Sequence, residues 1–470
     1  MPSSKLTTLC AMLVASSTLV GCAAMVKTPY HAPAVQTPSS FQYDKTQVAS
    51  NYANYANYAN YADRWWTLFG DTQLNQLVDQ VIAKNTDLAV AGITLRQARL
   101  KAGLAADQQG PRVNSSVSSS QNIDVNSGDR SSNGLSLNAG VSYELDLFGK
   151  LARQTEAAKW EALATAQDLQ ATAQTLIGTT TKLYWQLAYL NESLSTAQQS
   201  LATSEKLYSL VNTQYQAGAV SGLDLTQAEQ SVQSQKANLS QIQQSLVETR
   251  TALAVLLHIP VQQLNIQEPQ RLPQVNLPQI QAGLPASILS RRPDLRAAEL
   301  RLRETLATKD ATTASYYPSI SLTGSLGSSS TSLTELIKNP VLTLGANLSL
   351  PFLQYNDMKK NIAISQLDYE KAIIQYRQTL YQAFADVENA LSARTELNQQ
   401  VQFQQRNLEL AEKAERLTDV RYRNGAIALK NVLDQQQTTR TARLSLVNTK
   451  QSQYNAYVTL MQALGGSPIQ

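Results

Sequence analysis

One stretch of the chain alternates strictly between apolar and polar positions. From Leu135 to Leu147 every odd-numbered residue is apolar, and every even-numbered residue is polar or small. A period of two predicts a β-strand with one apolar face and one polar face. About ten residues of a tilted strand match the height of a bilayer's hydrocarbon core, so such a strand could face lipid on one side and water on the other.

Three further stretches show the same alternation. Residues 113–117 form a short, Ser-rich version, and residues 320–326 and 342–350 form clearer ones. A single stretch of this kind would be weak evidence, because ordinary soluble sheets also alternate. Together they predict four strands in two pairs, at about 112–147 and about 318–351.

Helical patterns flank the strands. Apolar residues at three-and-four spacing predict one helix over Gln73–Gln109, which Pro111 ends. A heptad seam predicts a long helix from Lys150 to about Tyr215, and a second helix, 223–257, follows a turn at Gly218. No proline falls within 112–259 or 352–467, which are the spans predicted as strands and long helices.

The second half of the chain repeats the first. Pro111 recurs as Pro318 (318 − 111 = 207) and Gly218 recurs as Gly425 (425 − 218 = 207). A constant offset predicts two copies of helix, strand, strand, long helix, turn and helix. The predicted segments are a signal segment 1–21, a leader 22–70, a first repeat 71–258, a Pro-rich connector 259–284, a second repeat 285–464 and a tail 465–470.

Composition and charge narrow the function. Of 470 residues only 16% are charged, and the net charge is +4. The densest basic cluster, 291–303, is interleaved with acidic residues as on a solvated helix face, so no nucleic-acid partner is expected. His31 and His258 have no ligand or nucleophile at a suitable spacing. We therefore expect no metal site, no cofactor and no catalytic residue, and the chain is not expected to be an enzyme.

The N-terminal segment resembles that of bacterial lipoproteins. Lys5 and a mildly apolar run lead to Gly21-Cys22, a sequence similar to the lipoprotein cleavage box, and the run is too short to span a membrane. The resemblance implies that Cys22 becomes the acylated first residue, and Ala23 is similar to the residue found in lipoproteins sorted to the outer membrane. The leader that follows contains Asn-Tyr-Ala four times in 51–62 and is expected to be flexible or draped on the surface.

Four strands of membrane height cannot close a barrel alone, because the smallest known barrels have about eight. Two open edges would leave roughly ten unpaired backbone groups in lipid, each costing several kcal/mol. Several copies of the chain must therefore share one barrel, and a head-to-tail interface closes into a ring. Two copies would supply about eight strands and three about twelve, and only the larger ring would enclose a water-filled lumen.

Three motifs resemble the TolC-like outer-membrane efflux factors. They are the junction Tyr143-Glu-Leu-Asp-Leu-Phe-Gly-Lys150, the run that begins at Pro318, and the segment from Ala383 to Leu391. The resemblance implies an α+β membrane protein and a homotrimer, with four strands per protomer in an outer-membrane β-barrel continuous with a periplasmic α-helical barrel. It also implies a passive duct in the outer membrane of a Gram-negative bacterium, served by a periplasmic adaptor and an inner-membrane pump.

The resemblance also assigns roles to the two helix–turn–helix tips. Gly218 and Gly425 would lie at the far periplasmic end, where an adaptor contacts them. Candidate gate residues occupy positions where the family ties its inner helices shut, or are the counterparts of those positions at the first tip. They are Arg421, Tyr422, Arg423, Asp434, Tyr215 and Asp224. Charge-assisted bonds suit a gate because a competing surface can break them, although ordinary solvated charges are an equally open interpretation.

Export of drugs and other small toxic compounds is the expected function. The same architecture would serve type I protein secretion or metal-ion efflux, although the scarcity of Met, His and Cys argues mildly against a metal relay. A lipid-anchored periplasmic coiled-coil scaffold without a pore is an alternative of a different class. The period-two stretches argue against that scaffold.

Overall fold

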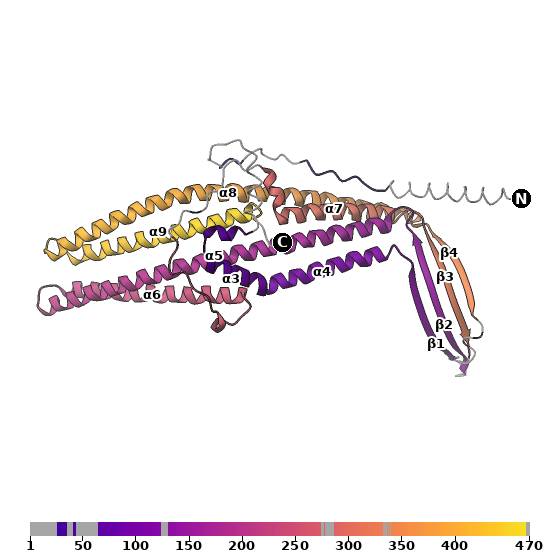
Figure 1. Ribbon diagram of the computed structural model, residues 1–470, viewed down its shortest axis with the longest axis horizontal. Helices are drawn as coiled ribbons and strands as arrows, with labels where there is room; N and C mark the ends of the chain where they lie inside the picture. The colour runs from indigo at the N-terminus through magenta and orange to yellow at the C-terminus, as the bar shows by residue number, and fades with distance from the viewer. Residues whose placement is uncertain are drawn as a thin grey trace. The chain divides into compact units, whose positions relative to one another are not determined.

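The computed structural model describes residues 26–34, 41–43, 64–123, 130–273, 277, 286–331, 336, 338 and 340–466. The predicted signal segment 1–21, the lipidation site Cys22 and the Asn-Tyr-Ala run at 51–62 lie outside the described residues. Figure 1 shows the elements in place. In chain order they are η2 (Trp65–Phe69), α3 (Thr72–Lys84), α4 (Thr86–Asp107), β1 (Arg112–Ile123), β2 (Arg130–Leu145), α5 (Lys150–Gln216), α6 (Gly222–Leu256), η3 (Val261–Gln263), η4 (Ala286–Arg291), α7 (Pro293–Ala314), β3 (Ser319–Ser330), β4 (Val341–Ser349), η5 (Pro351–Leu353), α8 (Tyr355–Arg423) and α9 (Leu429–Ala463).

The chain divides into two compact units. The first comprises Met1–Val35, Ile93–Gln167 and Arg296–Thr379, and it contains the sheet. The second comprises Gln36–Gly92, Asp168–Leu295 and Leu380–Gln470, and it contains the two helical hairpins whose tips were predicted from the sequence. Helices α5 and α8 have 67 and 69 residues, so each is about 100 Å long at about 1.5 Å per residue.

The sheet is antiparallel with the order β1-β2-β3-β4, and its strands lie side by side in Figure 1. The register pairs Val113 with Val141, Val141 with Gly324, and Gly324 with Leu344. Paired residues share a face, so most apolar positions of the four strands fall on one face, which also carries Ser115, Ser119 and Gln121 of β1, and the other face is mainly polar. The predicted alternation is confirmed, and its register shifts between Asn122 and Ile123.

One predicted helix is wrong in detail. Residues 73–109 form two helices, α3 and α4, because the backbone is extended at Asn85 (φ −67°, ψ 129°). The Asn85 side chain accounts for the break. Its Oδ1 accepts a hydrogen bond from the Leu88 N–H (3.1 Å), and its Nδ2 donates to the Leu256 carbonyl (3.0 Å). Asn competes for backbone hydrogen bonds in this way, which favours it at helix starts over helix interiors.

The internal repeat is confirmed by the element bounds. Helix α7 begins 207 residues after α4 (293 − 86 = 207), and β3 begins 207 residues after β1 (319 − 112 = 207). Helix α9 begins 207 residues after α6 (429 − 222 = 207). The offset slips between the second strand of each pair, where β2 has 16 residues and β4 has 9, and the start of the long helix that follows (355 − 150 = 205).

The core of the second unit is rich in aromatic residues. Trp65 and Trp66 are buried. The ring of Phe69 lies 5.1 Å from Trp185 and 5.8 Å from Tyr454, measured between centroids. These contacts tie the short helix η2 to α5 and α9. Among the described residues, no helix combines the length and the hydropathy that crossing a membrane would need.

Candidate functional site

The polar face of the sheet is a wall of hydroxyl and amide side chains. One row across it consists of Asn114, Gly140, Ser325 and Thr343. A Cβ on Gly140 would lie 2.6 Å from Oδ1 of Asn114, so a larger residue there would have to displace that amide. Of the described side chains on this face, the charged ones are Arg112 and Glu144, at the end of the sheet where the helices begin. Most side chains on this face are therefore polar and uncharged.

The junction between β2 and α5 explains the Glu-Leu-Asp-Leu-Phe-Gly motif. The Asp146 carboxylate accepts hydrogen bonds from two backbone N–H groups in the first turn of α5, at 3.1 and 2.7 Å. The Phe148 ring stacks on Tyr317 with centroids 4.7 Å apart. Gly149 has a φ of +77°, which a residue with a Cβ rarely adopts. The motif thus caps the long helix and joins the start of α5 to the start of β3.

Both helix–turn–helix tips have the same backbone geometry. Gly218 and Gly425 have φ angles of +74° and +72°. At the first tip the Gly218 N–H donates to the Tyr215 carbonyl (2.9 Å) and the Ala219 N–H to the Gln214 carbonyl (2.8 Å), and the second tip repeats this pair of bonds. This is a Schellman motif, and it confirms the predicted glycine caps. Contact of these tips with an adaptor stays a prediction.

The helices that leave the two tips begin differently. Ser221 is the N-cap of α6, and its side chain and that of Asp224 form a reciprocal capping box. The corresponding residue of the second tip is Ala428, which has no side-chain cap for α9. An N-cap Ser is worth about 1 kcal/mol relative to Ala. The start of α9 is therefore capped more weakly than the start of α6.

The predicted gate charges do not meet one another within one chain. Arg423 pairs with Asp419 (2.9 Å) and Asp434 pairs with Lys430 (2.5 Å), each four residues away on the same helix. Arg421 has no ion-pair partner among the described residues. The carboxylate of Asp224, already described, bonds to its own helix start. A gating role for these residues stays a prediction.

Tyr422 connects the two hairpins. Its hydroxyl donates to Oε1 of Gln214 on α5 (3.3 Å), and its ring packs against a buried cluster at the tips. That cluster consists of Val211, Ala228 and Leu429. Burial, followed by the negative charge of Asp224, raises the pKa of Tyr422, so the hydroxyl stays protonated and able to donate. Its counterpart Tyr215, at the end of α5, is exposed.

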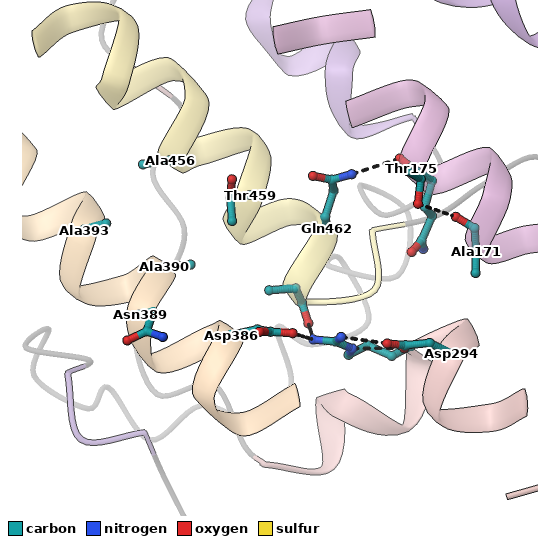
Figure 2. A pocket seen from close by; sticks show the side chains of 13 residues that line it. Ala171, Thr175, Asp294, Asp386, Asn389, Ala390, Ala393, Ala456, Thr459 and Gln462 are labelled. Carbon is teal, nitrogen blue, oxygen red and sulfur yellow. Dashed lines mark hydrogen bonds and ion pairs between the residues drawn. The ribbon is translucent and has the colours of Figure 1, made fainter. Parts of the chain in front are cut away.

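A buried arginine corrects the view of the basic cluster as a solvated face. Arg292 donates to both carboxylate oxygens of Asp294 (3.1 and 2.7 Å) and to Asp386 on α8 (3.0 Å). It also donates to the Ala463 carbonyl at the end of α9 (3.4 Å). Arg292, Asp294 and Asp386 are among the residues that line a cavity of about 570 Å³. Figure 2 labels Asp294, Asp386 and Thr459 among these lining residues. We call Arg292, Asp294, Asp386 and Ala463 the arginine hub.

The two histidines lie at a helix end and in the leader. His258 takes the left-handed position (φ +55°) that closes α6, and the N–H groups of His258 and Ile259 bond back to carbonyls of that helix. His31 lies in the described part of the leader. Within the described ranges, no group of three or more His, Cys, Asp or Glu side chains is placed to hold a metal ion.

Comparison with known proteins gives the family. A sequence profile described as outer membrane efflux protein matches residues 77–257 and 284–466. The chain belongs to this family. Each matched segment covers one of the two repeats, so the outer membrane efflux domain occurs twice in the chain. The family resemblance drawn from the motifs is confirmed, and efflux in the outer membrane, not catalysis, is the class of function.

Characterised relatives cover most of the chain. The pyoverdine export outer membrane protein OpmQ of Pseudomonas putida is 32% identical over 413 residues, which are 86% of this chain and 88% of OpmQ. The toluene efflux pump outer membrane protein TtgC of Pseudomonas putida is 29% identical over 468 residues, 97% of this chain and 95% of TtgC. The cation efflux system protein CusC of Escherichia coli is 28% identical over 457 residues, 95% of this chain and 96% of CusC. A crystal structure of CusC matches 94% of this chain and 99% of its own with a TM-score of 0.81, at 25% identity.

Proposed function

We propose that this protein is the outer-membrane channel of a tripartite efflux pump. It would be a homotrimer that conducts drugs and other small toxic compounds passively, while an inner-membrane pump supplies energy and a periplasmic adaptor opens the tips. The sheet carries the proposal. One of its faces is apolar and the other presents hydroxyl and amide groups, in register over four strands. Such a sheet fits a wall between lipid and water.

The two free edges of the sheet support a shared barrel. β1 and β4 are the outer strands, and Val113, Val117 and Leu344 near these edges are exposed on the apolar face. An unpaired backbone group in lipid costs several kcal/mol, so β1 of one protomer would pair with β4 of the next. Three protomers supply about twelve strands, which leaves room for a water-filled lumen.

Two helices of the first unit carry exposed apolar stripes that suit the same assembly. On each helix the residues recur at spacings of three, four or seven and so share one face. They are Ile93, Leu100 and Leu104 on α4, and Ile364, Leu367 and Ile374 on α8. Apolar stripes of this length on a single chain favour contact with another protein surface, here a neighbouring copy.

Aromatic residues and the lipid on Cys22 would position the protein in the membrane. Tyr317, Phe352 and Tyr355 are exposed at the end of the sheet where the helices begin. Aromatic side chains at such a level suit a membrane–water interface. Acyl chains on Cys22, each worth about 0.8 kcal/mol per buried CH2, would hold the chain at the same surface.

The wall proposal is tested by two arginine substitutions on one strand. Val117→Arg places a charge on the apolar face, where lipid contact would cost about 2–4 kcal/mol per protomer at mid-depth. Ser118→Arg, the matched control, places the same charge on the polar face. We expect Val117→Arg to abolish detergent-resistant trimers, and Ser118→Arg to assemble and to shift the reversal potential in planar bilayers. A water-soluble monomer that tolerates both substitutions would refute the proposal.

The gate is tested at the second tip. In a trimer, Arg421 would find its partners on a neighbouring chain, and Tyr422 would hold the two hairpins of its own chain together. Arg421→Ala combined with Asp434→Ala should therefore raise single-channel conductance. The control is Arg406→Ala with Glu409→Ala, an exposed pair on α8 away from the tip (2.8 Å). Equal conductance in both double variants would exclude the named charges from the gate.

The substrate class requires a genetic test. The names of the relatives above describe export of pyoverdine, toluene and cations, so the architecture alone does not choose among small solutes. Deletion of this chain, followed by growth with drugs, bile salts, dyes and metal salts, should sensitise cells to drugs and dyes. Sensitivity to metal salts alone would favour metal-ion efflux, and loss of a secreted protein would favour type I secretion.

A further inference from the structure

The described leader segment 26–34 is fastened to helix α7. The backbone N–H and the hydroxyl of Thr28 each donate to a different oxygen of the Asp310 carboxylate, both at 2.7 Å. Asp310 is only 3% exposed. A buried carboxylate is costly unless it is hydrogen-bonded, so the leader satisfies a group that α7 could not easily bury on its own.

Tyr30 makes the second contact of the leader. The Arg303 guanidinium lies 4.4 Å from the centre of the Tyr30 ring and 5.3 Å from that of Trp160 on α5, so it is held between two aromatic rings. The Tyr30 hydroxyl faces Glu299 (3.4 Å). Burial, reinforced by Glu299, raises the pKa of Tyr30 to about 12. The leader is therefore bound by specific groups on two helices.

The first repeat lacks the two carboxylates of this contact. The residues 207 positions before Asp310 and Glu299 are Gly103 and Gly92 (310 − 103 = 207, 299 − 92 = 207). Helix α4 thus has no carboxylate at either position, although its bounds match those of α7. A protomer has one leader, and only one of its two equivalent helices is equipped to bind it.

We propose that Trp160, Glu299, Arg303 and Asp310 form a leader dock, a binding site for the chain's own N-terminal segment that fixes where the lipid on Cys22 enters the membrane. This inference rests on the lipidation that forms part of the proposed function. Thr28 lies six positions after Cys22 (28 − 22 = 6), a span of at most about 20 Å. The dock keeps the acyl chains within that distance of Thr28 in the same protomer.

Asp310 lies close enough to the strands for the span from Thr28 to Cys22 to reach the membrane. It lies four residues before the end of α7 (314 − 310 = 4), about 6 Å along the helix. The stacked Phe148 and Tyr317 follow directly, at the level proposed for the membrane surface. The leader dock therefore lies close to the proposed membrane surface. Acyl chains on Cys22 can reach the membrane leaflet that the strands enter.

Thiol labelling tests the dock in the full-length trimer. Once Cys22 is acylated, the mature chain has no free thiol, so Val26→Cys, at a site 9% exposed, is a unique reporter for a hydrophilic maleimide. We expect labelling at least about tenfold faster in the Thr28→Val and Asp310→Ala backgrounds, the factor expected for losing one hydrogen bond to a charged group. Asp107→Ala, which removes an exposed carboxylate from α4, is the matched control and should leave the rate unchanged. Equal rates in Thr28→Val and the parent would overturn the dock.

Removing the lipid separates the dock from the anchor. With Cys22→Ser, in a chain that also carries Cys10→Ser so that Val26→Cys stays the only thiol, labelling should stay slow, because the dock holds the leader without lipid. Fast labelling would mean that lipid alone holds the leader. A dye on the exposed Pro29→Cys should transfer energy to headgroup-labelled lipids equally with and without Cys22→Ser, and less when Asp310→Ala is added. Equal transfer after that addition would refute the positioning role. Thr28→Val should conduct normally in planar bilayers, and absence of conductance in the parent would refute the proposed channel without affecting the dock.

Discussion

The arginine hub permits a substitution whose outcome can be calculated in advance. Arg292 corresponds to Asn85 in the first repeat (292 − 85 = 207), and their carbonyl acceptors Ala463 and Leu256 also correspond (463 − 256 = 207). Arg292→Asn therefore installs a residue that the first repeat already accommodates at this place. It can keep the bond to the Ala463 carbonyl, and it loses the two ion pairs.

The expected loss follows from the burial of the hub. The Arg292 side chain is 10% exposed, whereas those of Asp294 and Asp386 are 43% and 34% exposed. Breaking a fully buried ion pair costs about 3–5 kcal/mol, because the remaining charge is left without a partner. Both carboxylates here are partly hydrated, so we expect Arg292→Asn to lower the free energy of unfolding by about 2–3 kcal/mol. Removing the stranded charge with Asp386→Asn should recover about 1 kcal/mol.

The acid dependence of stability should change with the same substitution. Burial tends to raise the pKa of Asp294, but the hydrogen bond and charge of Arg292 outweigh it and hold that pKa below the usual value. The stabilisation is therefore complete above about pH 4, and it is lost as the pH falls through the lowered pKa. Without Arg292 this acid-dependent component should disappear.

Urea unfolding of the detergent-solubilised protein measures these effects. Trp65, Trp66 and Trp185 are buried in the same unit as Arg292, so tryptophan fluorescence reports on its unfolding. Arg291→Asn, at the preceding residue, is the matched control and should cost less than about 0.5 kcal/mol. A loss below about 1 kcal/mol for Arg292→Asn, or no recovery with Asp386→Asn, would contradict the argument.

Three further predictions concern helix starts and the connector. Ala428→Ser should give the second tip the N-cap of the first and slow hydrogen exchange at the start of α9 about fivefold. Ser221→Ala should speed hydrogen exchange at the start of α6 to a similar extent. Equal exchange in all variants would refute the capping difference. Asp146→Ala, which removes two bonds to the first turn of α5, should lower the urea midpoint by an amount equivalent to about 1–2 kcal/mol, and an unchanged midpoint would show that the cap is dispensable. The hydrogen bond from Arg250 lowers the pKa of Glu268. Hydrogen exchange in the connector should therefore rise below about pH 4 in the parent, but already at neutral pH in Arg250→Gln. A connector that exchanges alike in both proteins would contradict this prediction.

Local patterns were sufficient to predict the elements. The alternation from Leu135 to Leu147 predicted β2 because one buried or lipid-facing side requires a period of two. The absence of proline and the glycines at 218 and 425 predicted the long helices and their tips, because proline breaks helices and glycine closes them. Each of these signals lies within a few residues of the structure that it specifies.

Contacts between distant segments could not be predicted in the same way. Arg292 reaches a carboxylate 94 residues away and a carbonyl 171 residues away, and Thr28 reaches Asp310 across 282 residues. On a sequence, a buried arginine in an ion pair and an arginine on a solvated face look alike. The break at Asn85 was also missed, because its partner Leu256 lies at the end of a different helix. The repeat offset was the available signal, since it marks Asn85 and Arg292 as equivalent positions.

The places where the repeats differ follow from what occurs once per protomer. In the proposed trimer, two repeats per chain give six nearly equivalent positions around the axis, yet there are only three leaders. Two equivalent docks in each protomer would need four carboxylates, but glycine stands at two of these positions, Gly92 and Gly103. The two tips also differ. Ser221 caps the start of α6, whereas Ala428 provides no side-chain cap for the start of α9. If the hairpin that lacks this N-cap is the one that moves when the channel opens, Ala428→Ser should lower the open probability in planar bilayers. An unchanged open probability would mean that the difference at the tips has no part in gating.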